Sequence, residues 1–226
     1  MAHASYYSTD GTELPSVTTI MKILNKPAIA HWANSLGFKR ISYKKELDRT
    51  ALVGTIVHNI VEKKIRTDKK FLFKPVDEFD MNQLDYDSYI QANNAIISFN
   101  LWYQQNHEKL DVITTEKSMA SDKYGFGGTL DMLAYYEGKL YIIDFKTSSK
   151  VHATMFLQLS AYIQLAEENG YTIERVAILR LSKNCGVEFV EMSAKKAKRY
   201  FKVFLTLLDI YNSWNEILKE DWNEEL

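Results

Sequence analysis

The chain has 226 residues, of which 46% are hydrophobic and 25% charged, and its formal net charge at pH 7 is −1. This length favours a single domain, and the composition is that of an ordinary globular protein. It excludes a disordered acidic or basic tail protein and a uniformly basic nucleic-acid coat protein.

The single cysteine, Cys185, limits the cofactors that the chain can hold. One thiol excludes an intrachain disulfide, a zinc ribbon and a four-cysteine iron–sulfur cluster. No apolar run approaches the roughly 18 residues that a membrane span requires, and the first residues do not follow the pattern of a signal peptide. We therefore expect a cytoplasmic protein without a membrane partner.

Helical patterns dominate the first half of the chain. After a turn at Asp10-Gly11, Ser16 is expected to cap a short helix over 17–24, and Pro27 to begin a second helix that ends at Gly37. Apolar side chains recur at helical spacing over 46–66 and 85–105. Residues 67–82 mix charges with a proline, which favours a loop.

The pattern changes to strands near residue 110. One strand is expected to begin with 112–115, and two more are expected over 129–136 and 139–147, with a turn at Glu137-Gly138. A helix over 153–168 follows, then a second hairpin made of 175–181 and 187–192. Ser193 is expected to cap one final helix that runs to Glu216 or beyond. This order predicts one α/β domain over 1–226, with a mainly helical part over 1–109 and a mixed sheet with its last helix over 110–226.

Two aspartates and a lysine are expected to meet on the hairpin over 129–147. A symmetrical turn at Glu137-Gly138 places Asp131 opposite Asp144, and Lys146 points to the same face as Asp144. Two carboxylates among apolar neighbours are costly without a cation, and a divalent ion such as Mg²⁺ would remove that cost. An ion pair at the end of a sheet is the structural alternative. A three-residue turn would instead bring Asp131 opposite a phenylalanine.

Further polar residues stand at spacings that bring them to common faces. His58 lies near the buried face of its helix, as a core histidine or as a metal ligand. Glu62 shares that face and favours exposure. Gln158 and Tyr162 are four residues apart on the helix after the hairpin. Glu116, on the strand before the glycine-rich loop, is either an exposed strand residue or a further acidic member of the site.

In chain order, the sequence contains G-x-x-x-H at 54–58, G-G-T-x-D at 127–131, D-F-K-T at 144–147 and Q-x-x-x-Y at 158–162. This ordered set resembles the RecB-like branch of the PD-(D/E)XK nuclease superfamily. The segments 14–18 and 124–150 are also similar to the mitochondrial genome maintenance exonuclease and to related phage exonucleases. The resemblance implies a restriction-endonuclease-like core, a mixed central sheet flanked by helices. Leu130 stands where the superfamily name has its proline.

By that resemblance, Asp131 and Asp144 are the metal-binding carboxylates and Lys146 is the catalytic lysine. His58 would complete the metal site from its helix, and the backbone carbonyl of Phe145 would add a further ligand. The implied cofactor is Mg²⁺ or Mn²⁺, as one or two ions, without an iron–sulfur cluster.

The same resemblance assigns supporting roles to residues around this centre. Gln158, Tyr162 and Thr147 would support Lys146 or touch DNA. Glu116 matches a less constant acidic position and would be an additional metal ligand.

The implied activity is metal-dependent hydrolysis of DNA by an exonuclease acting on single strands or duplex ends in recombination, replication or repair. The alternatives are a structure-specific endonuclease of the same fold and a non-catalytic DNA-binding subunit. Because the net charge is near zero, DNA affinity must come from local basic stretches such as 39–45, 63–70 and 195–199. A bacterial cell or a phage-infected host is the expected setting. A helicase or single-strand-binding partner is a further possibility that no residue identifies.

Overall fold

A computed structural model describes residues 5–24, 27–66, 81 and 83–219 of the chain. The expected loop over 67–82 therefore lies, apart from residue 81, outside the described residues. The helical segments are α1 (Val17–Ile20), η1 (Met21–Ile23), α2 (Pro27–Phe38), α3 (Tyr43–Arg66), α4 (Tyr86–Asn106), η4 (His107–Lys109), α5 (Ala153–Glu168), α6 (Ala194–Ala197), η5 (Lys198–Tyr200) and α7 (Phe201–Ile217). The strands are β1 (Tyr6–Tyr7), β2 (Glu13–Leu14), β3 (Leu110–Ser121), β4 (Phe126–Tyr136), β5 (Lys139–Lys146), β6 (Arg175–Leu181) and β7 (Val187–Ser193).

A five-stranded sheet in the order β3-β4-β5-β6-β7 forms the centre of the fold. Neighbouring strands are antiparallel except β5 and β6, which are parallel and are joined through α5. A parallel pair requires such a crossover connection, whereas the antiparallel pairs are joined by tight turns. The expected α/β fold with a mixed sheet flanked by helices is confirmed.

Each face of this sheet is covered by its own group of helices. Helices α1, α5, α6 and α7 pack on one face, around buried residues such as Phe126, Leu159 and Phe204. Helices α3 and α4 pack on the other face, around residues such as Val57 and Phe99. Both strand faces are therefore buried, which explains the nearly continuous apolar run of β5.

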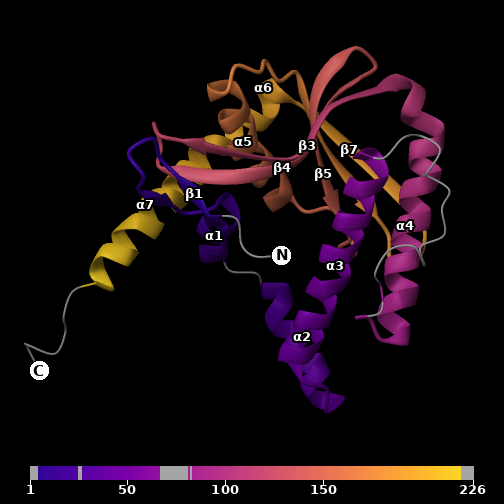
Figure 1. The fold of residues 1–226 in the computed structure, drawn as a ribbon. Helices are drawn as coiled ribbons and strands as arrows, with labels where there is room; N and C mark the ends of the chain where they lie inside the picture. The colour runs from indigo at the N-terminus through magenta and orange to yellow at the C-terminus, as the bar shows by residue number, and fades with distance from the viewer. Residues whose placement is uncertain (1–4, 25–26, 67–80, 82, 220–226) are drawn as a thin grey trace, which may run out of the picture.

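Helix α2 lies beside the first half of α3, and together they project from the body as an arm (Figure 1). The first half of α3 therefore belongs to the arm, and its second half belongs to the core. Its buried side chains begin at Val53 and continue to Lys64. His58 stands in the part of α3 that contacts the sheet.

The expected helix caps and several boundaries are confirmed. The Ser16 side chain accepts a hydrogen bond from the Thr19 backbone, and Ser193 does the same for Lys196. The expected single final helix is wrong, because a 3₁₀ turn at Lys198–Tyr200 separates α6 from α7. The strand expected to begin with 112–115 begins two residues earlier, because β3 pairs with β4 from Leu110 to Ser121.

Candidate active site

The β4–β5 hairpin places two aspartates at one end of the strand pair. Glu137 and Gly138 both have positive φ, which is typical of a two-residue hairpin turn. The five backbone pairs run from Tyr136–Lys139 to Met132–Ile143, so the expected symmetrical register is present. Asp131 and Asp144 follow directly after the last of these pairs.

Asp131 connects the hairpin to helix α3. The Phe145 backbone N–H donates a hydrogen bond of 2.7 Å to Asp131 Oδ2, and His58 Nδ1 lies 3.5 Å from the same oxygen. Burial raises the pKa of Asp131, while the positive charge of Lys146 and the hydrogen bond from Phe145 act in the opposite direction. The carboxyl is therefore held at the junction of a strand end and a helix.

Asp144 and Lys146 form a buried ion pair at the end of β5. Lys146 Nζ lies 2.5 Å from Asp144 Oδ2, and the Asp144 side chain is 1% exposed. Burial raises the pKa of Asp144 to about 6, against the charge of Lys146. Burial acts to lower the pKa of Lys146, but the charges of Asp144 and Asp131 outweigh it, so this pKa is raised. Within the described residues, Asp144 Oδ1 is buried and accepts no hydrogen bond.

Glu116 joins this group from the neighbouring strand β3. It stands between the pairs Thr115–Met132 and Lys117–Leu130, and so opposite Asp131. Its φ of 48° lies in the left-handed region, which costs a residue with a side chain roughly 1–3 kcal/mol. Burial raises the pKa of Glu116 to about 7, and the charge of Asp131 adds to this effect.

The imidazole of His58 is neutral at physiological pH. Burial lowers its pKa to about 4, with the positive charge of Lys146 acting in the same direction. A neutral imidazole keeps a lone pair for a metal ion. An edge contact with the Phe145 ring, with centroids 6.0 Å apart, packs the His58 side chain against the end of β5.

His58, Glu116 and Asp131 together have the chemistry of a divalent metal site. Their ligand atoms lie within 4.8 Å of one another. Two carboxylates with raised pKa values record the cost of burying negative charge without a cation, and an ion at this place would remove that cost. Carboxylate oxygens suit Mg²⁺, and one imidazole also suits Mn²⁺. Asp144 lies outside this cluster, and its buried Oδ1 accepts no hydrogen bond from the described residues.

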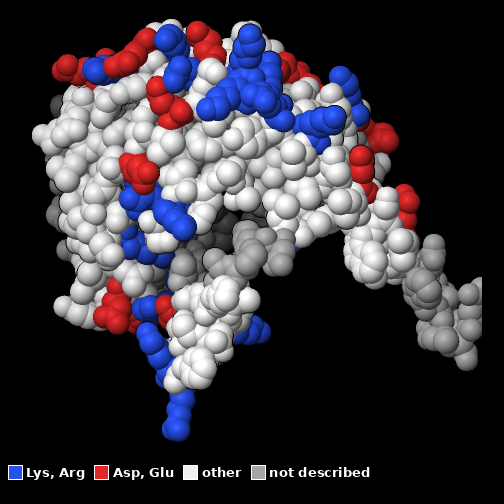
Figure 2. Space-filling view, turned by 180° about the vertical axis from the view of Figure 1, so that it is seen from behind, with Lys and Arg blue, Asp and Glu red and all other residues white. Residues whose placement is uncertain are grey.

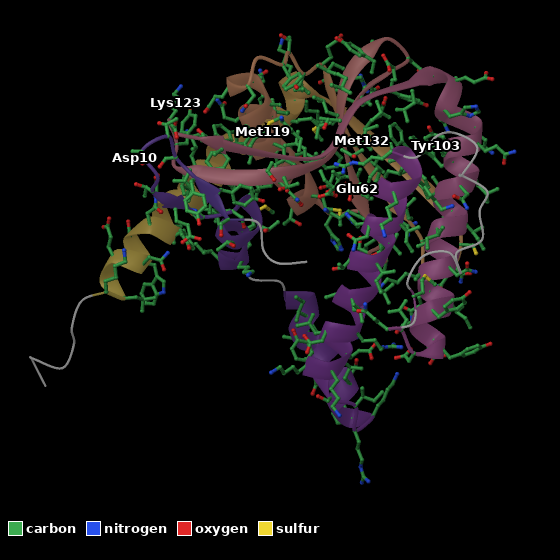
Figure 3. All side chains as sticks on the ribbon, in the orientation of Figure 1. Asp10, Glu62, Tyr103, Met119, Lys123 and Met132 are labelled. Atoms are coloured by element: carbon green, nitrogen blue, oxygen red, sulfur yellow. The ribbon has the colours of Figure 1, made fainter. Side chains whose placement is uncertain are left out.

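Glu62 is less exposed than its sequence position suggests. It was expected to be exposed, but its side chain is only 21% exposed and forms an ion pair of 2.9 Å with Arg66. Its charge also raises the pKa of Glu116. Figure 3 shows Glu62 on the part of α3 that lies against the sheet, so it belongs to the acidic surroundings of the site.

Gln158 and Tyr162 meet as their spacing predicts. Gln158 Nε2 donates a 2.8 Å hydrogen bond to the Tyr162 hydroxyl. Tyr162 is 4% exposed, so it is placed to support the site from the core and not to touch DNA. Its ring packs on Gly128, where a Cβ atom would lie 2.7 Å from Tyr162 Cε1. Thr147 lies beside Gly54, and its hydroxyl would be 3.4 Å from a Cβ added there.

Other sequence expectations meet different outcomes in the structure. Lys64, in one of the expected basic stretches, is 1% exposed and so lies inside the protein. Cys185 is exposed and stands in the turn between β6 and β7. Among the described residues, no helix combines the length and the apolar character that crossing a membrane would take.

Comparisons with known proteins address the family of the chain. The family model described as the PD-(D/E)XK nuclease superfamily matches residues 16–224. Among solved structures, a protein from Eubacterium rectale named a putative exonuclease is similar at 11% identity and a TM-score of 0.48, over 73% of this chain and 68% of that one. A structure named SSO0001 is similar at 16% identity and a TM-score of 0.31, over 67% of this chain and 74% of that one. No curated protein matches the chain significantly.

Proposed function

The chain belongs to the PD-(D/E)XK nuclease superfamily, and we propose that within it the protein is a Mg²⁺- or Mn²⁺-dependent DNA exonuclease. The observation that carries the proposal is the meeting of two groups at one sheet edge. One is the cluster of His58, Glu116 and Asp131, and the other is the buried pair of Asp144 and Lys146. A divalent cation and an adjacent ammonium both favour hydrolysis of a phosphodiester, because they stabilise the negative charge that grows on the phosphate during the reaction.

Each side chain has a definite task in this proposal. A bound divalent ion supplies a more acidic water and neutralises charge on the phosphate. His58, Glu116 and Asp131 would hold that ion, and the carbonyl of Phe145 remains a further proposed ligand. Lys146, kept protonated and held in place by Asp144, orients the attacking water and stabilises the charge that develops on the phosphate oxygens.

The arm supports a single-stranded or end-exposed DNA substrate. Lys39, Arg40, Lys44 and Lys45 are all exposed there, and Phe38 is 84% exposed beside them. Figure 2 shows Lys and Arg side chains along the projecting arm and beside the hollow where it meets the body. Exposed aromatic rings stack on unpaired bases, and nearby cations follow the phosphate backbone.

The proposal is tested by digestion of end-labelled linear single-stranded and double-stranded DNA beside closed circles, with Mg²⁺, Mn²⁺ or a chelator. We expect loss of linear DNA only, dependent on the metal and abolished in Lys146→Ala and Asp144→Asn. The exposed Lys139, at the far end of β5, offers the matched control Lys139→Ala, which should retain activity.

The same assay separates the alternatives. Cutting of closed circles would replace the exonuclease by a structure-specific endonuclease. A folded, metal-binding protein that binds DNA and cuts none of the substrates would contradict a nuclease and favour a binding subunit.

A further inference from the structure

A pocket of about 620 Å³ opens beside Lys146. This volume lies within the range of sites that hold small ligands. His58 and Lys146 line one part of it, so the pocket is continuous with the candidate active site. The rest of its lining comes from α3, α4, the segment after β5, the end of β6 and the turn between β6 and β7. These elements contribute Thr50, Gln91, Ser148, Arg180, Lys183 and Asn184, among others.

The composition of this lining favours an anion. Its described residues include the cations Lys146, Arg180 and Lys183 and several hydroxyl and amide groups, and none of them is a carboxylate. Two of the cations are already paired outside the pocket lining, Lys146 with Asp144 and Arg180 with Glu188 at 2.7 Å. In the part of the chain that the structure describes, the Lys183 ammonium has no carboxylate within ion-pair distance.

Lys183 is half-buried, which makes its lack of a partner costly. Burial lowers its pKa, the charge of Arg49 adds to this, and Glu46 acts in the opposite direction. A partly desolvated ammonium gains more from a nearby anion than an exposed one does. The pocket therefore contains one cation whose charge is available to a ligand.

The turn that carries Lys183 is held in place before any ligand arrives. Asn94 Nδ2 donates a 2.9 Å hydrogen bond to the Lys183 carbonyl, and the Gly186 N–H donates a 3.0 Å bond to Ser98 Oγ. Both bonds fix the turn to α4. The Ser182 N–H closes the turn on the Gly186 carbonyl at 2.9 Å. A fixed backbone reduces the ordering cost that binding would otherwise carry.

The sheet topology explains why this pocket lies next to the catalytic lysine. Strands β5 and β6 are parallel, and Lys146 is the register partner of Arg180. Both strands therefore end at the same sheet edge, and Lys183 follows directly after β6. The carboxyl ends of parallel strands are where α/β sheets bind ligands.

We propose that this pocket is a subsite for a backbone phosphate of the bound strand, next to the phosphate that is cleaved, with Lys183 as its principal cation. The ligand is a phosphate diester for two reasons. The cations and hydroxyl groups of the pocket favour an anion, and the pocket is continuous with the place where a strand would be hydrolysed. This inference rests on the proposed nuclease function. It adds a binding site for a phosphate of the DNA strand other than the one that is cleaved.

The test compares Lys183→Ala, Lys183→Arg and the control Lys139→Ala in steady-state cleavage of a short single-stranded oligonucleotide. Loss of a charged contact is expected to raise KM about tenfold in Lys183→Ala, with kcat within about twofold. Lys183→Arg should recover most of the affinity. The salt dependence of log KM should become shallower by about 0.7, the amount for one phosphate contact on a single strand.

Substrates with one neutral methylphosphonate at successive positions identify the contacted phosphate. In the wild type, one position beside the cleavage site should reproduce the tenfold rise of KM, and the same substitution should have no further effect in Lys183→Ala. Equal sensitivity of wild type and variant at every position would overturn the proposal. So would a variant that changes only inhibition by added inorganic phosphate, because the pocket would then hold the free ion.

Binding of the labelled oligonucleotide in chelator separates failure of the subsite from failure of the nuclease function. If the protein binds the oligonucleotide through Lys183 but never cuts it, the subsite proposal stands and the proposed nuclease function is contradicted. If neither cleavage nor binding changes when Lys183 is substituted, the subsite proposal is contradicted and the proposed nuclease function stands.

Discussion

Glu116→Gln is expected to stabilise the metal-free protein at pH 8. The Glu116 carboxyl has a pKa of about 7 in the folded chain, compared with an ordinary value of 4.5, chiefly because of burial and the charge of Asp131. The folded protein therefore holds this proton at pH values where the unfolded chain has lost it. Stability falls as the pH rises from 4.5 to about 7, and the loss is complete above that range. Glutamine has nearly the same shape and carries no charge to bury.

The size of the effect follows from the two pKa values. A difference from 4.5 to about 7 corresponds to at most about 3.5 kcal/mol, at about 1.4 kcal/mol per pH unit. Glu116 is partly exposed, so solvent screening reduces the expected gain to about 1–2 kcal/mol. For a chain of this length, that corresponds to a rise in Tm of about 2–8 °C.

Thermal unfolding in chelator at pH 5 and pH 8 measures this difference. The gain in Tm from Glu116→Gln should be large at pH 8 and much smaller at pH 5, where most of the wild-type carboxyl is protonated. The exposed Glu108 provides the control variant Glu108→Gln, which should change Tm little at either pH. A Glu116→Gln protein that is equally or less stable than wild type at pH 8 would refute the electrostatic argument.

Adding Mn²⁺ should reverse the order of the two proteins. Ion binding to the folded state stabilises it by about 3 kcal/mol at a hundred times Kd. Glu116→Gln would lose a charged ligand and should gain less stability from the ion than the wild type does. An equal rise in Tm for both proteins would place the ion away from Glu116.

Three further outcomes are expected. Lys146→Ala should lower the cleavage rate at least about a hundredfold while retaining DNA binding, measured by single-turnover kinetics and by anisotropy; a variant with wild-type rates would remove Lys146 from the reaction. Mn²⁺ affinity, measured by calorimetry, should rise as the pH increases from 5.5 to 8, because burial raises the pKa of Asp131 and raises the pKa of Glu116 to about 7, so that protons on these carboxyl groups compete with the ion; an affinity independent of pH would contradict these ligands. Gly128→Ala should lower the free energy of unfolding by about 1–3 kcal/mol in denaturant titration, because its Cβ would meet the Tyr162 ring at 2.7 Å, and unchanged stability would contradict that packing.

Local patterns were sufficient where neighbours in sequence decide the structure. The two-residue turn at Glu137-Gly138 is a strong hairpin signal, and it determines the register that brings Asp131 and Asp144 to one edge. Helix α5 and strand β6 also begin and end where the pattern predicts. The helical spacing of Gln158 and Tyr162 similarly predicts their hydrogen bond.

Features that depend on contacts between distant segments were not predictable in this way. Glu116 reaches Asp131 through a left-handed backbone on a neighbouring strand, and no local pattern indicates that conformation. Lys183 comes near Lys146 only because β5 and β6 are parallel and α5 crosses between them. The segment Lys183-Asn184-Cys185-Gly186 looks like an ordinary exposed turn in the sequence. Lys183 is half-buried because of contacts that form when the sheet and its helices pack together.

The most direct test of the account is cleavage of an end-labelled single strand while Mg²⁺ is titrated in and then removed with a chelator. Wild type, Lys146→Ala and Asp144→Asn are assayed side by side, and each is confirmed to be folded. The account predicts metal-dependent release of nucleotides by the wild type, reversed by the chelator and absent in both variants. Cleavage that persists in chelator or in either variant would contradict an active site built on the end of β5.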